Sequence, residues 1–283
     1  MHFLDKYPFL VKYFENGIKN PNKSIAHSIL LYGHDLQAQY DLALYIARLL
    51  NCKKDQNYDC NCLDCNWIRM GEHPAVLTIS RVDNKSDGDD SKTVISIKQA
   101  QEIKQSLLTS SDFHRVFIFC DRDNDDNIQG LNKLNFHEEA ANALLKTIEE
   151  PPAKTTFCFL TRSKEDILST IISRSQCFFV PSFEATDYKW DSIKTIFENY
   201  YEFSRGEVFD LAKELNDVSP NAIKTLNEIQ NYMLSLLKSN LDNKQIQFKL
   251  MHDIEAVELA KNEVTANVLP LNAFENLCLD IIK

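Results

Sequence analysis

The sequence predicts an α/β domain built on a parallel β-sheet, followed by a largely α-helical C-terminal region. Over roughly the first 180 residues, short apolar runs alternate with longer segments of helical periodicity, which is the pattern of parallel strands joined by crossover helices. Beyond Phe183 the apolar residues keep a helical spacing and strand signals almost cease. The two patterns indicate more than one domain in a chain of 283 residues.

The first predicted strand and the first predicted helix follow each other directly. The run HSILLYG at residues 27–33 is apolar up to its glycine, as in a buried parallel strand that ends in a turn. Residues 35–51 then place apolar side chains three and four positions apart, which predicts an amphipathic helix. The chain therefore begins its sheet with a strand, a glycine turn and a helix.

The rest of the predicted sheet follows the same alternation. Four further strands are predicted, at residues 75–80, 115–121, 155–161 and 176–180. Helical periodicity runs from Ile97 to Leu108, and strong helix formers fill residues 137–150. Pro151 and Pro152 end that second helix because proline cannot donate the helical hydrogen bond. The acidic stretch 82–92 predicts a solvated loop.

Composition and charge exclude several classes of protein. No stretch approaches the roughly 20 apolar residues that span a bilayer, and the N-terminal segment lacks the apolar run of a secretory signal. We therefore expect a cytoplasmic protein that makes no membrane contact. The formal net charge of −10 argues against a protein that coats nucleic acid alone, because such proteins carry a basic face.

The eight cysteines fall into two groups. One group lies within fourteen residues and consists of Cys52, Cys60, Cys62 and Cys65. Four thiolates can surround a tetrahedral zinc ion, so we predict a structural zinc site, with free reduced thiols as the alternative. The single residue between the second and third cysteines is a tighter spacing than usual. The other group lies in apolar surroundings and is predicted to consist of buried small hydrophobes: Cys120, Cys158, Cys177 and Cys278.

The order of these segments resembles that of bacterial clamp-loader AAA+ subunits. The matching pieces are HSILLYG, GEHPAVLTI, ISIKQAQEIKQSL, RVFIFCD, NALLKTIEEPP and LSTIISRSQCFF, of which NALLKTIEEPP is the most specific. The resemblance implies a degenerate AAA+ α/β domain at residues 1–165, with an inserted four-cysteine module at 52–65. It further implies a small helical lid domain at residues 166–215 and a helical collar or oligomerisation domain at 216–283.

Within this family an active ATPase carries G-x-x-x-x-G-K-[ST] after the first strand, where backbone N–H groups and the lysine bind phosphates. The corresponding stretch here keeps Gly33, but Gln39 replaces the lysine and Tyr40 replaces the magnesium-binding hydroxyl residue. Where the family has Asp-Glu this chain has Asp121 and Arg122, and a guanidinium cannot act as a general base. The resemblance thus implies a chain that binds no ATP. It is closer to the non-hydrolysing delta-prime subunits than to the gamma/tau ATPase subunits.

Ser173, Arg174 and Ser175 match the Ser-Arg-Cys motif of the family, with serine in place of cysteine. In the family this arginine projects into the ATP site of a neighbouring subunit, where it stabilises charge on the γ-phosphate. The resemblance therefore makes Arg174, with Ser173 beside it, the candidate catalytic residue, acting in trans on a partner's ATP site. The alternative is a surface arginine in an ordinary salt bridge.

Taken together, the resemblance implies a non-hydrolysing clamp-loader subunit of the replicative DNA polymerase III holoenzyme. Its expected partners are the gamma/tau ATPase and delta subunits and, through the complex, the sliding clamp and primer-template DNA. Two alternatives stay open. A gamma/tau-like active ATPase with an atypical phosphate loop would bind magnesium-ATP tightly. A stand-alone zinc protein would bind nucleic acid without partners, and its affinity would fall steeply with salt.

Overall fold

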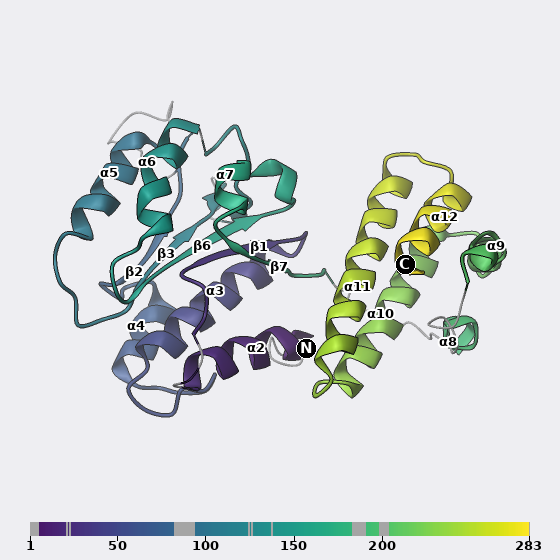
Figure 1. Ribbon diagram of the computed structural model, residues 1–283, viewed down its shortest axis with the longest axis horizontal. Helices are drawn as coiled ribbons and strands as arrows, with labels where there is room; N and C mark the ends of the chain where they lie inside the picture. Colours follow the sequence, from purple (N-terminus) through teal and green to yellow (C-terminus); the bar gives the residue numbers. More distant parts are fainter. Residues whose placement is uncertain are drawn as a thin grey trace. The chain divides into compact units, whose positions relative to one another are not determined.

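The chain forms two compact units in the computed structural model (Figure 1). The structure describes residues 6–20, 22, 24–81, 94–123, 125, 127–136, 138–182, 191–197 and 204–282. One unit spans Leu10–Val180, and the other contains the residues from Pro181 onward together with those up to Phe9. The division falls just after the last strand. A separate lid at 166–215 and collar at 216–283 stay predictions, and the acidic stretch 82–92 lies outside the described residues.

The first unit is built on a parallel sheet with the strand order β2-β3-β6-β1-β7. Its strands are β1 (Ser28–Tyr32), β2 (Val76–Ile79), β3 (Arg115–Phe119), β6 (Thr155–Thr161) and β7 (Gln176–Phe179). All neighbouring pairs are parallel, which confirms the predicted sheet. The central strands β1, β3 and β6 are almost entirely buried, and this explains their uninterrupted apolar runs. Because the strands are parallel, their carboxyl ends share one edge of the sheet and their amino ends the other.

Helices cover both faces of this sheet. They are α2 (Pro8–Lys19), α3 (Leu36–Asn51), α4 (Leu63–Met70), α5 (Ile97–Ser106), α6 (Glu138–Glu149) and α7 (Ser169–Ile172). Helices α5 and α6 pack together on one face, and α3 lies on the opposite face (Figure 1). Helix α5 begins with the capping box of Ser96 and Gln99. Helix α6 ends just before Pro151, as the sequence predicts.

The core under α5 and α6 is aromatic. Alternate residues of a strand point to the same face, so Phe117 and Phe119 of β3 meet Phe157 and Phe159 of β6. The rings of Phe117 and Phe157 stack with centroids 5.4 Å apart, and those of Phe119 and Phe159 with centroids 4.9 Å apart. This cluster fixes the central strands against the helices, and with them the loops at the two edges of the sheet.

A short hairpin interrupts the alternation of strands and helices after β3. It consists of β4 (Asp121–Arg122) and β5 (Ile128–Gln129), which pair in antiparallel fashion. No strand is predicted from the sequence in the segment between Asp121 and the helix at residues 137–150. The hairpin places Asp121 and Arg122 next to the carboxyl edge of the sheet.

The second unit is helical over its described residues, as predicted for the C-terminal region. Its elements are α8 (Asp191–Phe197), η4 (Arg205–Glu207), α9 (Val208–Asp217), α10 (Ala222–Ser239), α11 (Lys244–Thr265) and α12 (Pro270–Ile281). Helix α10 packs on α11, and α12 packs on both α11 and α9. The apolar stripe of α10 is buried in this core through Leu226, Ile229, Met233 and Leu237. Intramolecular packing therefore accounts for the stripe.

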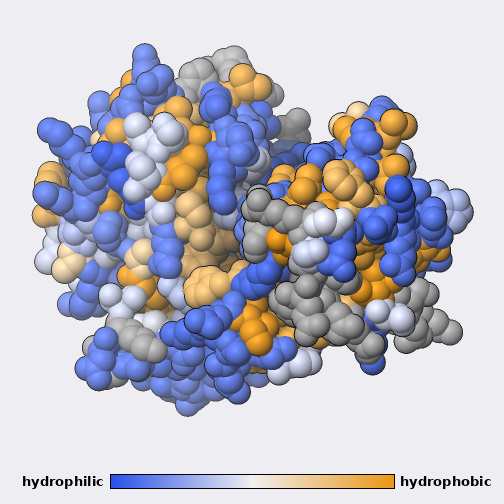
Figure 2. Space-filling model, turned by 45° about the vertical axis from the view of Figure 1, so that its right-hand side comes forward, coloured by the Kyte–Doolittle hydropathy of each residue, from blue (hydrophilic) through white to orange (hydrophobic). Residues whose placement is uncertain are grey.

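The surface of the helical unit is mixed. Figure 2 shows apolar residues, in orange, scattered among hydrophilic ones. The exposed large apolar side chains of this unit are Phe209, Phe248, Leu259, Leu269 and Leu279. An oligomerising role for these helices stays a prediction. Across the described residues, none of the helices combines the length and the apolar character needed to cross a membrane.

Candidate functional site

The turn between β1 and α3 lies at the carboxyl edge of the sheet, where open α/β sheets bind their ligands. Gly33 has a φ of 132° there, and a Cβ at this position would lie 2.3 Å from the carbonyl oxygen of Val180. Only glycine fits both conditions. Its N–H group lies 3.2 Å from the carbonyl oxygen of Thr161 and 3.1 Å from that of Arg162. The one glycine kept from the phosphate-loop motif is thus needed by the backbone itself.

Gln39 fills the turn from inside. Its side chain is fully buried, and Nε2 donates hydrogen bonds to the carbonyl oxygens of Gly33 at 2.7 Å and Thr161 at 3.1 Å. The lysine of a working phosphate loop extends toward the phosphates, whereas this amide is bound to the loop and to β6. Asp35 caps the N-terminus of α3 by accepting a hydrogen bond from the N–H of Ala38 at 3.0 Å. A carboxylate therefore stands at the helix terminus that would otherwise attract phosphate.

Tyr40 and Arg122, for which the resemblance implies the positions of two catalytic groups of an ATPase, contact each other. The hydroxyl of Tyr40 lies 3.0 Å from Oγ1 of Thr78 on β2. Nη2 of Arg122 donates to the same hydroxyl at 3.3 Å, and the guanidinium lies 6.0 Å from the centre of the tyrosine ring. The contact joins α3 to β2 and to the β4–β5 hairpin. Neither side chain is left in the role that the motif gives it.

Asp121, for which the resemblance implies the position of the magnesium-binding carboxylate, is paired with a cation of this chain. Its Oδ2 lies 3.0 Å from Nε of Arg81 and accepts a hydrogen bond from Nδ2 of Asn135 at 3.0 Å. The residue is 4% exposed. Its second oxygen, Oδ1, has no hydrogen-bond partner in the part of the chain that the structure describes. The arginine supplies the positive charge that a metal ion would bring to this carboxylate.

The four clustered cysteines converge as predicted. Their sulfur atoms all lie within 4.8 Å of one another, and all four residues are buried. Sγ of Cys52 lies 3.5 Å from that of Cys60 and 3.9 Å from that of Cys62. Zn–S bonds of about 2.3 Å in a tetrahedron give S–S edges of roughly 3.8 Å, so the four residues fit a zinc ion. The tight spacing of Cys60 and Cys62 does not prevent convergence.

The thiols of this cluster titrate differently from one another. Burial raises the pKa of Cys65 and that of Cys52. Backbone hydrogen bonds from Cys62 and Asp55 lower the pKa of Cys60 to about 7. A metal ion takes all four as thiolates and releases the remaining protons. None of the eight cysteines forms a disulfide, and three of the second group, Cys120, Cys158 and Cys278, are buried as expected, while Cys177 is half-buried.

Two arginines that the sequence analysis did not single out hold the cysteine loop. Nη2 of Arg69 donates to the carbonyl oxygens of Tyr58 at 3.0 Å and Cys60 at 2.8 Å. Nη2 of Arg48 donates to the same carbonyl of Tyr58 and lies 3.5 Å from that of Asn57. Arg69 is exposed, whereas Arg48 is buried. An arginine within the apolar end of α3, one turn before the first cysteine, is the signal that could have revealed the second of these residues.

Arg174 lies at the opposite edge of the sheet from the phosphate-loop turn. It precedes β7, whose first residue, Gln176, pairs with Ile29 near the start of β1. The turn at Gly33 follows the end of β1, and a strand rises about 3.3 Å per residue, so roughly 13 Å of strand separates the two edges. The structure therefore does not bring Arg174 together with Gln39 or Asp121.

Arg174 is partly exposed and pairs with α6. Its Nε donates to Oε1 of Glu149 at 2.7 Å, and Nη2 lies 2.5 Å from the same oxygen. Nη1 donates to the carbonyl oxygen of Thr170 at 2.8 Å and to Oγ of Ser173 at 3.2 Å. The structure thus joins the end of NALLKTIEEPP to the Ser-Arg motif. The ordinary salt bridge that is the alternative role for Arg174 is present in this chain.

Ser175, the residue that replaces the cysteine of the motif, points into the unit. Its Oγ lies 2.7 Å from Oγ of Ser28 at the start of β1. The pair of hydroxyls satisfies Ser28, which is fully buried. The serine that stands in place of the motif cysteine therefore has a partner in β1.

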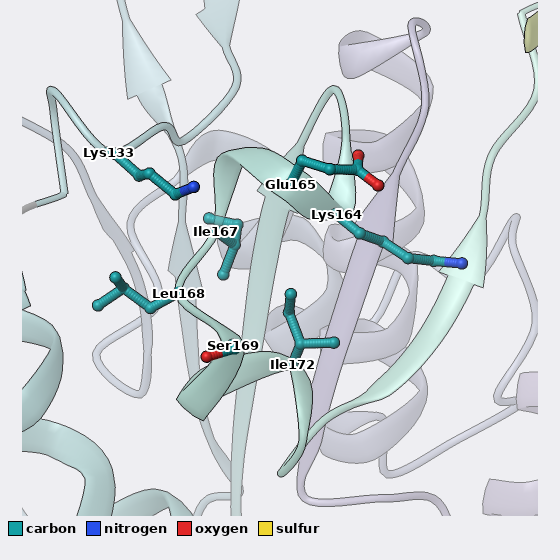
Figure 3. Close-up of a pocket in the computed structure, with 7 residues that line it drawn as sticks. All are labelled: Lys133, Lys164, Glu165, Ile167, Leu168, Ser169 and Ile172. Carbon is teal, nitrogen blue, oxygen red and sulfur yellow. The ribbon is translucent and has the colours of Figure 1, made fainter.

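A pocket of about 440 Å³ lies between the end of β6 and α7 (Figure 3). Ile167 and Ile172 point toward each other across it, and Lys133 points in from its rim (Figure 3). Lys164 extends outward, with Nζ 4.2 Å from the centre of the Tyr32 ring. None of the residues predicted from the sequence as site residues lines this pocket.

Comparison with known proteins gives one family. The family model described as "DNA polymerase III, delta subunit" matches residues 7–184. The DNA polymerase III subunit delta' of Escherichia coli (strain K12) is 28% identical over 178 residues, covering 62% of this chain and 48% of that protein. Subunit delta' of Buchnera aphidicola subsp. Schizaphis graminum is 28% identical over 178 residues, covering 61% and 48%. Subunit gamma of Buchnera aphidicola subsp. Acyrthosiphon pisum is 30% identical over 156 residues, covering 54% and 38%. The aligned part thus spans about half or less of each relative.

Proposed function

This chain belongs to the DNA polymerase III delta subunit family, and on that premise we propose that it is a non-hydrolysing, delta-prime-like subunit of a clamp loader. Its partners in this proposal are the gamma/tau ATPase and delta subunits, with the sliding clamp and primer-template DNA reached through the complex. The observation that carries the proposal is the turn filled by Gln39, with Asp121 already paired to Arg81.

Nucleotide binding would have to undo these contacts. Phosphates entering the turn would displace Gln39 from two backbone carbonyls, and a magnesium ion would compete with Arg81 for Asp121. Each buried polar group left without its partner costs about 1–3 kcal/mol. Arg122 has no base to offer the attacking water, because its guanidinium stays protonated. Binding and hydrolysis are therefore both disfavoured.

A calorimetric titration of the full chain with magnesium-ATP tests this proposal. We expect no heat of binding at millimolar nucleotide, with an ATP-binding gamma/tau subunit as the positive control. Tight binding would favour the second candidate, an active ATPase with an atypical loop. The observation in favour of that candidate is Oδ1 of Asp121, a buried carboxylate oxygen without a hydrogen-bond partner among the described residues.

We propose further that Arg174 acts in trans on the ATP site of a neighbouring subunit. Its position at the edge opposite the filled turn and its 31% exposed side chain support this role. Before assembly, Glu149 neutralises the guanidinium, and the γ-phosphate of the neighbour would replace that carboxylate as its partner. The planar, permanently charged fork suits a phosphoryl group on which charge builds up. Ser173 steadies the guanidinium through its hydroxyl.

The cysteine cluster is proposed to hold structural zinc through Cys52, Cys60, Cys62 and Cys65. Four thiolates leave no open position, so the metal would supply cross-linking of the loop between α3 and α4 and no catalysis. Metal analysis of protein purified without chelators is the test, and we expect one zinc per chain. Well under one zinc per chain would favour free thiols. A stand-alone nucleic-acid-binding role for the module is disfavoured by the net charge of −10.

A further inference from the structure

Arg48 is a buried arginine beside the cysteine cluster, and no carboxylate among the described residues forms an ion pair with it. The residue is 5% exposed and lies in the last turn of α3, four positions before Cys52. Its partners are backbone carbonyls of the cysteine loop and two aromatic rings, those of Tyr58 at 5.2 Å and Tyr45 at 6.0 Å. It forms no ion pair with an acidic residue of the described chain, and its Nε has no hydrogen-bond partner there.

A buried guanidinium without a counter-charge is unfavourable, because arginine stays protonated and loses its hydration. The adjacent cysteine cluster, when it holds zinc, has an excess of negative charge. Four thiolates carry four negative charges and Zn²⁺ carries two positive ones, so a loaded site would keep two negative charges inside the protein. The guanidinium reaches this cluster through its loop, because its two carbonyl partners, Asn57 and Tyr58, lie between Cys52 and Cys60.

We propose that Arg48 is the buried counter-charge of the four-cysteine metal centre and that it sets the affinity of the cluster for zinc. The inference rests on the zinc site proposed above, and it assigns to this arginine a part in metal binding beyond the four ligands. Groups outside the ligand set commonly change metal affinity by roughly 10–100-fold. The N–H of Gln56, 3.3 Å from Sγ of Cys52, is a second and uncharged contribution of the same kind.

The competing explanation is that Arg48 only holds the loop in shape. Arg69 separates the two explanations, because it also donates to the carbonyl of Tyr58, and to that of Cys60, yet it is exposed. Replacing Arg69 removes loop hydrogen bonds and leaves the buried charge in place. Replacing Arg48 removes loop hydrogen bonds and the buried charge together.

The test measures zinc affinity of the full chain by competition with a chromophoric chelator. It compares the wild type with Arg48→Gln, Arg48→Lys and Arg69→Gln, and it records the thiolate-to-metal charge-transfer band of the Co²⁺-loaded forms. We expect Arg48→Gln to weaken zinc binding by roughly 10–100-fold and to shift the band. Lysine should restore part of the affinity, because it keeps the charge without the planar fork. Arg69→Gln should lose clearly less affinity than Arg48→Gln and leave the band in place, because it removes loop hydrogen bonds but no buried charge.

Each failure has a distinct signature. Equal losses in Arg48→Gln and Arg69→Gln would assign Arg48 to loop shape and overturn the proposal. Unchanged affinity in Arg48→Gln, with a wild type that binds zinc, would overturn it while leaving the zinc site intact. A wild type that binds no zinc would overturn both the proposed zinc site and the proposed role of Arg48. If Arg48→Gln folds only with metal, the zinc concentration at which half of the chains are folded is measured in place of the affinity. The same concentration for the variant and the wild type would contradict the proposal.

Discussion

The two edges of the parallel sheet differ in how their charged and polar side chains are paired. At the carboxyl edge, Gln39 and Asp121 are buried and bound to groups of the same unit. At the amino edge, Arg174 is 31% exposed and Glu149, its partner, 45% exposed. The two arginine side chains are similarly exposed, since that of Arg81 is 33% exposed, but the side chain of its partner Asp121 is only 6% exposed. Exposed ion pairs contribute roughly 0–1 kcal/mol, whereas removing the partner of a buried charge costs several times more. A partner molecule can therefore replace Glu149 in the contact with Arg174 at small cost. A ligand at the carboxyl edge would have to break buried contacts to open the turn at Gly33.

Removing Arg81 tests the buried side of this comparison. Arg81→Ala leaves Asp121 without its cation, and we expect the free energy of unfolding to fall by about 3 kcal/mol, measured by urea denaturation. The matched control is Arg162→Ala, an exposed arginine near the same edge, which should change stability by less than about 0.5 kcal/mol. Similar small losses in both variants would mean that Asp121 is well solvated and open to a metal ion.

His114 sharpens the comparison, because it lies at the amino edge yet is mostly buried. Burial, aided by the charge of Lys154, lowers its pKa from 6.5 to about 4, and its Nε2 lies 2.8 Å from Oγ1 of Thr156. Below pH 6.5 the unfolded chain gains a proton on this residue that the folded chain accepts only near pH 4. Stability present above pH 6.5 is therefore lost as the pH falls to about 4, by about 3 kcal/mol.

The measurement is urea denaturation at several pH values, with His114→Gln for comparison. The difference in stability between the two chains should shrink by this amount as the pH falls from 6.5 to 4. A constant difference would show that His114 titrates alike in both states. In that case the amino edge would be solvated throughout.

Glu149 gives the smallest expected effect. Glu149→Ala removes the exposed partner of Arg174, and we expect the free energy of unfolding to change by less than about 1 kcal/mol. Glu150→Ala, which changes the neighbouring exposed carboxylate, is the matched control. A loss above about 2 kcal/mol in Glu149→Ala alone would show that the Arg174 pair is structural and not free to exchange partners.

Much of the fold could be predicted from the sequence, because each strand or helix depends mainly on the residues within its own segment. The strands at residues 115–121 and 155–161 are uninterrupted apolar runs because they are buried on both faces, and Pro151 ends α6 by its own chemistry. The cysteine cluster was found because its four ligands lie within fourteen residues. The β4–β5 hairpin was missed because its polar strands carry no apolar alternation.

The pairings that define the site were not predictable in the same way. Arg81 and Asp121 stand 40 positions apart, and Glu149 and Arg174 stand 25 positions apart, so only the order of strands in the sheet brings them together. Gln39 could be recognised as a missing lysine, but not as the group that fills the turn. When a motif residue is substituted, the sequence shows which functional group is lost. The contacts of the new side chain depend on the fold around it.

The central claim is that the carboxyl edge is closed to ATP while the amino edge serves a partner's ATP. The most direct test is the ATPase rate of a clamp loader reconstituted with this chain as wild type, Arg174→Ala, Arg174→Lys or Gln39→Ala. An arginine of this kind contributes roughly 10³–10⁵-fold at the site that it serves. We predict that both Arg174 variants remove the contribution of one site while assembly persists, and that Gln39→Ala leaves the rate unchanged. An unchanged rate with Arg174→Ala, or a loss with Gln39→Ala, would contradict the account.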